Sequence, residues 1–350
     1  MATKAIKKTV ILNDTSHELH HGCKMVMSNI RSLLSKRGVR IIDANPVHVN
    51  WEDNRRLQEN IKKSDFVVIN GEGTLHHNQK TGLYLLKAAS FCRKCGIPVA
   101  LINATYYENN QEFGVYMKNF DLIFVRESIT LQGLRKSGIQ SEVVPDMTFY
   151  NSLGLAPKIP NNRVGFTDSV FLELSEKLLD YSKKSEDFIF LPILISVRIE
   201  SPCQVKSILR KIKFEALKAV NIRGKSLIKK KISHVYERMA YYIESSEEYM
   251  QAINALKLLV TGRFHSLCFA LKTQTPFLTF MLDSYKVEGL LNDIGLGRER
   301  IITIEDLDDG RIKRYGDFTE DEFKKITAYT DTAGARIEAM FDKIISLAGR

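Results

Sequence analysis

An arginine and a histidine stand two residues apart in the segment 261–265, Thr-Gly-Arg-Phe-His, directly after the apolar run 258–260. If this segment is extended, Arg263 and His265 point to the same side. A guanidinium can bind a carboxylate or phosphate through two hydrogen bonds, and an imidazole can move a proton near neutral pH. We therefore predict that His265 is catalytic and that Arg263 binds substrate. The alternative is a His265 that is merely hydrogen-bonded to a backbone carbonyl.

A turn with two glycines follows a second apolar run, Phe66–Asn70. Glycines let the backbone fold tightly, and the N–H groups of a following helix can bind an anion. The turn is not a P-loop, because the Gly-Lys-Ser/Thr ending is absent. The predicted substrate-binding residues here are Gly71, Glu72, Gly73 and Thr74. A tight turn that binds nothing is the alternative.

Two more charged residues come directly after apolar runs. Arg126 follows the run 122–125, and either binds an anionic ligand or forms a local salt bridge. Asp146 follows Val-Pro at 144–145, and either orients a sugar hydroxyl, acts as a base or caps the next turn. We include both among the candidate substrate-binding residues.

A group of histidines lies in the turn after the first predicted strand, 9–13. His17, His20 and His21 have helical spacing that could suit a metal, but no fourth ligand pattern accompanies them. We therefore expect no metal, and assign His20 and His21 to substrate binding.

The order of the predicted elements explains why these turns matter. Short apolar runs alternate with amphipathic stretches, which indicates βαβ units and parallel sheets. The 350 residues exceed what one hydrophobic core usually fills. We predict an α/β fold with two Rossmann-like domains facing a cleft, at residues 1–155 and 163–320, a linker at 156–162 and a C-terminal helix at 321–350. Ligands of such sheets bind beyond the carboxyl ends of the strands, where the candidate residues stand.

The net charge of +10 is confined almost entirely to one segment. Residues 206–231 contain ten basic residues and one acidic residue, and so carry +9 of that charge. Phe214 is the one aromatic residue among them, which argues against a nucleic-acid partner. Read as a helix, 204–219 is basic and amphipathic, which suits peripheral contact with an anionic membrane. The alternative is that its apolar side packs against the sheet.

The remaining composition indicates a cytoplasmic protein. Five scattered cysteines favour a reducing compartment. The apolar run at 10–12 is too short for the core of a signal peptide, and the stretch 188–197 is far shorter than a membrane span. We therefore expect a cytoplasmic location, with peripheral contact at the inner face of the membrane.

The motifs described above resemble those of the polysaccharide pyruvyl transferase family. The resemblance rests on Gly-Glu-Gly-Thr at 71–74, Val-Arg-Glu-Ser at 125–128, Val-Pro-Asp at 144–146 and Gly-Arg-Phe-His at 262–265, in the family's order. It implies a fold like that of GT-B glycosyltransferases, and transfer of pyruvate from phosphoenolpyruvate to sugar hydroxyls as a ketal. His265 would be the acid/base, Arg263 and Arg126 would hold the donor, and a glycan or lipid-linked saccharide would be the acceptor. No metal or redox cofactor is implied.

One segment departs from the family pattern. The family commonly has an Asn-x-Gly-Asp turn where residues 20–24 read His-His-Gly-Cys-Lys, without the acidic residue. A second hypothesis therefore stays open: a GT-B glycosyltransferase that uses a nucleotide-activated donor, such as a CMP-linked 2-keto acid sugar. That donor would also place a carboxylate beside the reacting carbon.

Overall fold

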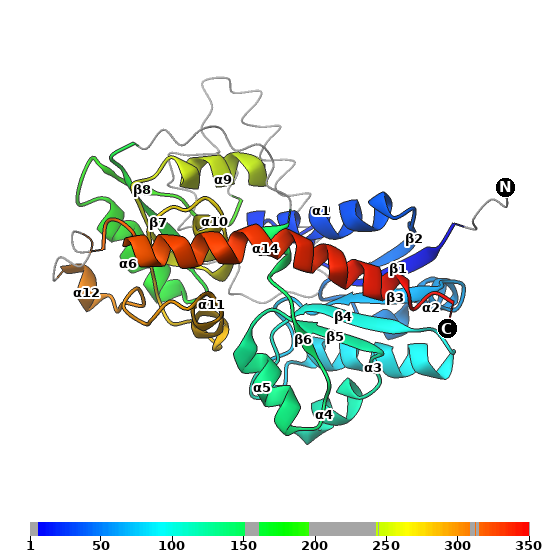
Figure 1. The fold of residues 1–350 in the computed structure, drawn as a ribbon. Helices are drawn as coiled ribbons and strands as arrows, with labels where there is room; N and C mark the ends of the chain where they lie inside the picture. The colour runs from blue at the N-terminus through cyan, green and yellow to red at the C-terminus, as the bar shows by residue number, and fades with distance from the viewer. Residues whose placement is uncertain are drawn as a thin grey trace, which may run out of the picture.

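The computed structural model describes residues 6–150, 161–195, 243, 245–308, 312 and 315–349. Most of the predicted linker 156–162 and all of the basic segment 206–231 lie outside these residues, as does the predicted helix 204–219. The described residues form two α/β units that lie side by side, joined by one long helix (Figure 1).

The first unit is a six-stranded parallel sheet in the order β2-β1-β3-β4-β5-β6. Its strands are β1 (Lys8–Asp14), β2 (Arg40–Pro46), β3 (Phe66–Asn70), β4 (Val99–Ala104), β5 (Leu122–Val125) and β6 (Glu142–Val143). Its helices are α1 (His21–Lys36), α2 (Arg55–Lys62), α3 (Lys80–Lys94), α4 (Gln111–Met117) and α5 (Ser128–Lys136).

Alternate residues of these strands enter two separate hydrophobic clusters. In β1, Ile11 belongs to one cluster, whereas Val10 and Leu12 belong to the other. In β3, Val68 and Val67 divide in the same way. Successive side chains of a strand point to opposite faces, so helices cover both faces of this sheet.

The second unit is a four-stranded parallel sheet in the order β10-β9-β7-β8. Its strands are β7 (Val164–Ser169), β8 (Phe188–Phe190), β9 (Leu258–Gly262) and β10 (Phe277–Thr279). Its helices are α6 (Leu172–Ser182), α9 (Ser246–Asn254), α10 (Phe264–Lys272), α11 (Lys286–Ile294) and α12 (Glu305–Asp308). Read from the other edge, the order β8-β7-β9-β10 is the same as the order β2-β1-β3-β4 of the first sheet, if the strands of each unit are numbered from its own first strand. The predicted α/β class with two Rossmann-like units is confirmed.

One predicted strand is too long. The apolar residues 188–196 predict a strand, but β8 ends at Phe190. Pro192 has no N–H group to donate to a neighbouring strand, which explains the early end.

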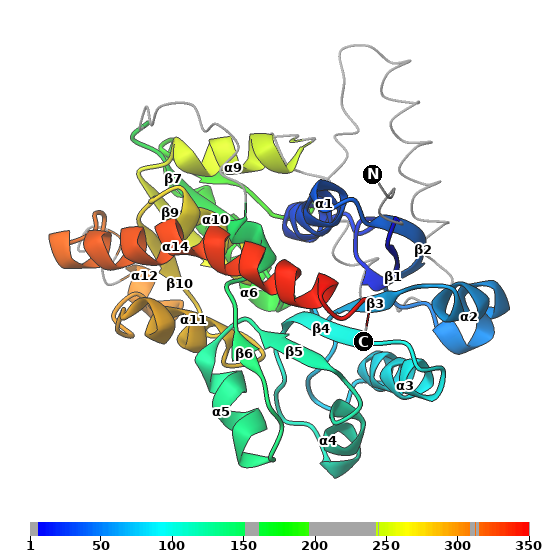
Figure 2. The ribbon, with the colours of Figure 1, turned by 45° about the vertical axis from the view of Figure 1, so that its right-hand side comes forward.

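The last long helix, α14 (Glu320–Ile345), packs against both units (Figure 2). A capping box between Thr319 and Glu322 defines its start. Its apolar residues share one cluster with Ile30 of α1 and Leu267 of α10. The two units are therefore held by a common core. Among the described residues, no helix is long and apolar enough to cross a membrane.

Candidate active site

The carboxyl ends of the two sheets meet where the strand order of each sheet reverses. In the first sheet β1 lies between β2 and β3, and in the second β7 lies between β8 and β9. Such reversals are where open α/β sheets bind ligands. Contacts cross the junction directly: His21 N–H donates to Ile193 O (3.1 Å), and the N–H of Ile195 donates to Leu19 O (2.9 Å).

Charged and titratable side chains from both sheets gather at this junction, which we call the junction cluster. Its members are His20, Glu72, Arg126, Asp146, Arg263, whose charge acts on His20, and His265. All six were predicted from the sequence as site residues. Tertiary contacts thus bring together groups that are up to 245 positions apart in the sequence.

His265 lies at the centre of the cluster, in the first turn of α10. Its Nε2 is 3.6 Å from Asp146 Oδ2 and 3.7 Å from Glu72 Oε1. The side chain is 8% exposed, and Nε2 has no hydrogen-bond partner among the described residues. Leaving a buried polar atom without a partner costs free energy, so this nitrogen is a natural place for a ligand to bind.

The pair Arg126 and Asp146 supports His265 from the first sheet. Arg126 Nη1 donates to Asp146 Oδ2 (3.0 Å) and its Nε donates to Thr105 Oγ1 (2.8 Å). Asp146 also caps the following turn by accepting the Thr148 N–H (2.9 Å). Of the alternatives left open by the sequence, the structure shows the local salt bridge for Arg126 and the cap for Asp146. Burial by itself would raise the pKa of Asp146, but His265 and Arg126 lower it well below its usual range.

Arg263 approaches the cluster from the second sheet. Its Nε donates to Asp168 Oδ2 (2.5 Å). The expectation of an extended Arg263–His265 segment is wrong, because α10 begins at Phe264 and Arg263 is its N-cap. Gly262 lets β9 lie close to β7 just before this helix, because a Cβ there would collide with Ser169 of β7. The two side chains therefore contact different partners.

The glycine turn contributes one member to the cluster. Glu72 Oε2 accepts from Thr15 Oγ1 (3.1 Å), and its Oε1 accepts from Cys23 Sγ (2.9 Å). Gly71 and Gly73 shape the turn, since a Cβ on Gly71 would collide with Ala104 and Gly73 has a φ of +70°. The expected helix N-terminus behind these glycines is wrong, because α3 begins only at Lys80. Thr74 is buried nearby.

The two neighbouring histidines diverge. His20 caps α1 by accepting the Cys23 N–H at Nδ1 (3.2 Å), and its ring lies edge-on to His265 with 5.4 Å between centroids. Burial, together with the charges of His265 and Arg263, lowers the pKa of His20. His21 instead stacks on Tyr249 at 4.7 Å. Burial and the Lys24 charge lower its pKa to about 3.

Three further residues reach the junction that were not among the predicted site residues. Lys286 Nζ donates to Asp283 Oδ1 (2.8 Å). Burial lowers the pKa of Lys286, and the charges of Arg126 and Arg263 lower it further. Asp168 is the penultimate residue of β7, and Asp283 lies in the segment after β10. Both acids lie near strand ends, the same region of the sheets in which the sequence located Arg126 and Arg263.

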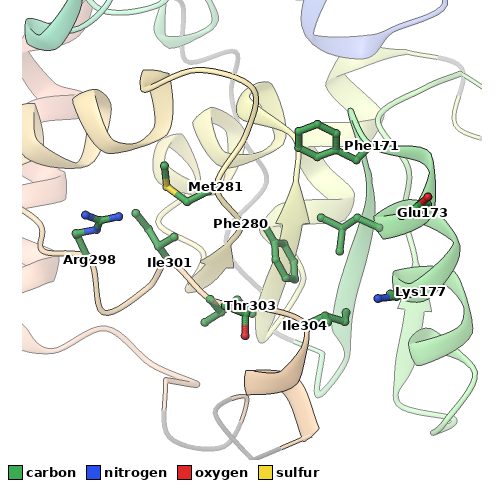
Figure 3. Close-up of a pocket in the computed structure, with 11 residues that line it drawn as sticks. Phe171, Glu173, Lys177, Phe280, Met281, Arg298, Ile301, Thr303 and Ile304 are labelled. Carbon is green, nitrogen blue, oxygen red and sulfur yellow. The ribbon is translucent and has the colours of Figure 1, made fainter.

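A separate cavity of about 610 Å³ lies in the second unit (Figure 3). It is lined by the start of α6 and by the segments after β10, with Phe171 and Phe280 on its walls and the cations Lys177 and Arg298 among its lining residues. None of its lining residues belongs to the junction cluster.

Comparison with known families gives a match over most of the chain. The family model described as polysaccharide pyruvyl transferase matches residues 20–284, which include all six members of the junction cluster. A search of curated proteins finds no match.

Similar solved structures include three enzymes described as UDP-N-acetylglucosamine 2-epimerases. The one from Methanocaldococcus jannaschii, in complex with UDP-GlcNAc and UDP, is 14% identical with a TM-score of 0.57, over 97% of this chain and 99% of that one. Those from Rickettsia bellii (11% identity, TM-score 0.56, 97% and 96% covered) and Neisseria meningitidis (10%, 0.53, 97% and 100%) are similar. At such identities the likeness concerns the fold, which is GT-B-like.

The low pKa of Asp146 predicts an acid-dependent loss of stability. Because folding lowers this pKa, the carboxylate stabilises the protein fully above the unfolded-state pKa of about 3.9, and this contribution is lost as pH falls toward the folded-state pKa. We expect Asp146→Asn to lower the free energy of unfolding by about 3 kcal/mol near pH 7, since it leaves Arg126 buried without its anion. Urea denaturation should show that this difference shrinks below about pH 4.

Asp342→Asn is the matched control. Asp342 also pairs with an arginine, Arg37 (2.8 Å), but its side chain is 70% exposed. We expect a cost below about 1 kcal/mol there. An equally small cost for Asp146→Asn, or a cost that is independent of pH, would contradict the assignment.

Proposed function

The chain belongs to the polysaccharide pyruvyl transferase family, and we propose that it transfers the pyruvyl group of phosphoenolpyruvate to a hydroxyl pair of a glycan or lipid-linked saccharide. The products would be a cyclic ketal and inorganic phosphate. The observation that carries this proposal is the buried Nε2 of His265, which lies between the carboxylates of Asp146 and Glu72 but makes no hydrogen bond among the described residues. Arg126 and Arg263, which follow strands of the two sheets, lie nearby.

His265 would supply the proton that starts the reaction. Protonation of the methylene carbon of phosphoenolpyruvate makes a cationic carbon, which one sugar hydroxyl attacks. Departure of phosphate regenerates the cation, a second hydroxyl attacks it, and the hydroxyl protons return to His265 and to phosphate. The atoms balance without an oxidant or reductant, so the reaction calls for no redox cofactor.

Arg263 and Lys286 are the best-placed cations to meet the donor. Their side chains are 14% and 11% exposed, against 4% for Arg126, which is committed to Asp146 and Thr105. Arg263 forms an ion pair with Asp168, and Lys286 forms one with Asp283. The carboxylate and phosphate of the donor would therefore bind these cations alongside the two aspartates or in their place. Fixed positive charge in a buried site stabilises anionic groups far better than it does in water. Arg126 would then act mainly by positioning Asp146 beside His265.

Removing the imidazole should stop transfer while leaving the fold intact. We expect His265→Ala to lower the rate of phosphate release from phosphoenolpyruvate, in the presence of a panel of glycan acceptors, by at least about a hundredfold. His48→Ala is the control, because His48 follows β2 outside the junction cluster and is 40% exposed. Near-normal turnover in His265→Ala, or no phosphate release by the folded wild type with any acceptor, would refute the proposal.

The cavity beside α6 favours a second candidate, a glycosyltransferase with a nucleotide-activated donor such as a CMP-linked sugar. Aromatic walls suit a nucleobase and the two lining cations suit its phosphates. Thermal shift separates the candidates. Stabilisation by phosphoenolpyruvate but not by CMP, of about 3 kcal/mol at a hundredfold excess over Kd, is the result expected for pyruvyl transfer. The reverse result would favour glycosyl transfer.

We also propose that the protein works in the cytoplasm and contacts the anionic inner face of the membrane through residues 206–231. The support is their charge of +9. Combining Lys211→Glu, Lys213→Glu and Lys218→Glu should abolish sedimentation with vesicles that contain phosphatidylglycerol, because each basic residue near such a surface contributes about 1 kcal/mol. Vesicles of phosphatidylcholine alone are the control. Unchanged binding by the triple variant would remove this proposal.

A further inference from the structure

Two imidazoles and a thiol converge at the junction of the two units. One ligand atom from each of His20, Cys23 and His265 lies within 4.8 Å of the others. Cys23 lies in the first turn of α1, three residues after the His20 cap, whereas His265 comes from α10 of the other unit. We propose that these three residues form a binding site for a zinc-class divalent cation. This departs from the expectation of no metal drawn from the sequence, because His265 joins the site from a segment far from His20 and Cys23.

The hydrogen bonding of the two imidazoles supports this assignment. Nδ1 of His20 accepts the Cys23 N–H, so Nε2 is the nitrogen that can bind a metal without disturbing the cap. His265 is more than nine-tenths buried, and its Nε2 has no hydrogen-bond partner among the described residues. That unpartnered nitrogen is an observation independent of the clustering, and it points to a bound group.

Glu72 completes the surroundings of the site. Its Oε1 is 2.9 Å from Cys23 Sγ and 3.7 Å from His265 Nε2. The carboxylate can serve as a fourth ligand, or it can accept the proton that the thiol loses when the metal binds. Metal binding would form bonds to one sulfur and two nitrogens, and would release that proton without any redox change.

Ligand chemistry selects the metal. Imidazole and thiolate favour Zn²⁺ over Mg²⁺ or Ca²⁺, which prefer oxygen. Bonds of about 2.0 to 2.3 Å place tetrahedral ligand atoms about 3.5 Å apart, so the side chains need to close by about 1 Å.

A metal bound at this site would block pyruvyl transfer, an inference that rests on the proposed function. A metal bound to Nε2 of His265 takes the electron pair that would otherwise carry a proton. Zinc-loaded enzyme would then release no phosphate until a chelator removes the metal. The site would thus act as a metal-sensitive block on transfer.

Cobalt(II) chloride, added to the metal-free protein, tests binding without any activity assay. We expect one equivalent to bind and to produce the near-ultraviolet absorption of a thiolate–cobalt bond. Cys23→Ser should remove that band, and His20→Gln should weaken binding by at least about tenfold while the thiolate remains. His20→Gln also serves if Cys23→Ser fails to fold.

Cys95→Ser is the matched control, because Cys95 is a half-buried free thiol at the end of α3. A band that disappears in Cys95→Ser, or the absence of a band in the wild type, would overturn the proposal. A second experiment measures phosphate release from phosphoenolpyruvate by the wild type and by Cys23→Ser, with and without zinc. If neither releases phosphate, the proposed function fails, whereas the cobalt band still decides whether the metal site exists.

Discussion

The buried ion pair between Arg126 and Asp146 is the interaction on which the rest of the site depends. Both side chains are almost completely removed from water, and a buried charge is tolerated only with a partner and further hydrogen bonds. Thr105 and Thr148 supply those bonds. The pair thereby places a fixed carboxylate 3.6 Å from Nε2 of His265, which comes from the other sheet. The geometry of the junction cluster and the joining of the two units are thus parts of one arrangement.

The apolar core fixes the position of the two units relative to each other. One cluster continues from α1 through α10 to α14, so the two sheets cannot separate without exposing a shared core. Lys272 adds a polar tie by donating to the carbonyl oxygens of Thr148 and Tyr150 (2.9 Å each). Gly22 allows the start of α1 to lie close to α10, because any side chain at this position would collide with His265. The histidine is therefore positioned by packing as well as by charge.

The two chemical roles proposed for the junction share one atom. Nε2 of His265 can carry a proton or bind a metal, but it cannot do both at once. Cys23 and His20 belong to the proposed metal site, whereas Arg263 and Lys286 belong to the proposed binding of the donor. This separation follows from geometry: the thiol and His20 belong to the start of α1, and the two cations follow strands of the second sheet.

Much of the fold followed from the sequence, because it depends on short-range patterns. Apolar runs predicted β3 and β5 with their observed bounds, and the strand-end rule located Arg126, Asp146, Arg263 and His265. The apolar patterns did not predict the short helices α2 and α4, or that Arg263 and His265 would separate at the start of α10. It also predicted the same role for His20 and His21.

What the sequence by itself determined is the α/β class, the two-unit organisation and the strand ends at which chemistry could occur, since these depend on local periodicity. Only the tertiary structure decided which of those residues meet. His20 and His21 diverge because successive residues at a helix start point in different directions, so one faces His265 and the other Tyr249. Arg126 became the partner of Asp146, and Cys23 the neighbour of His265, through contacts between distant segments that no local pattern encodes.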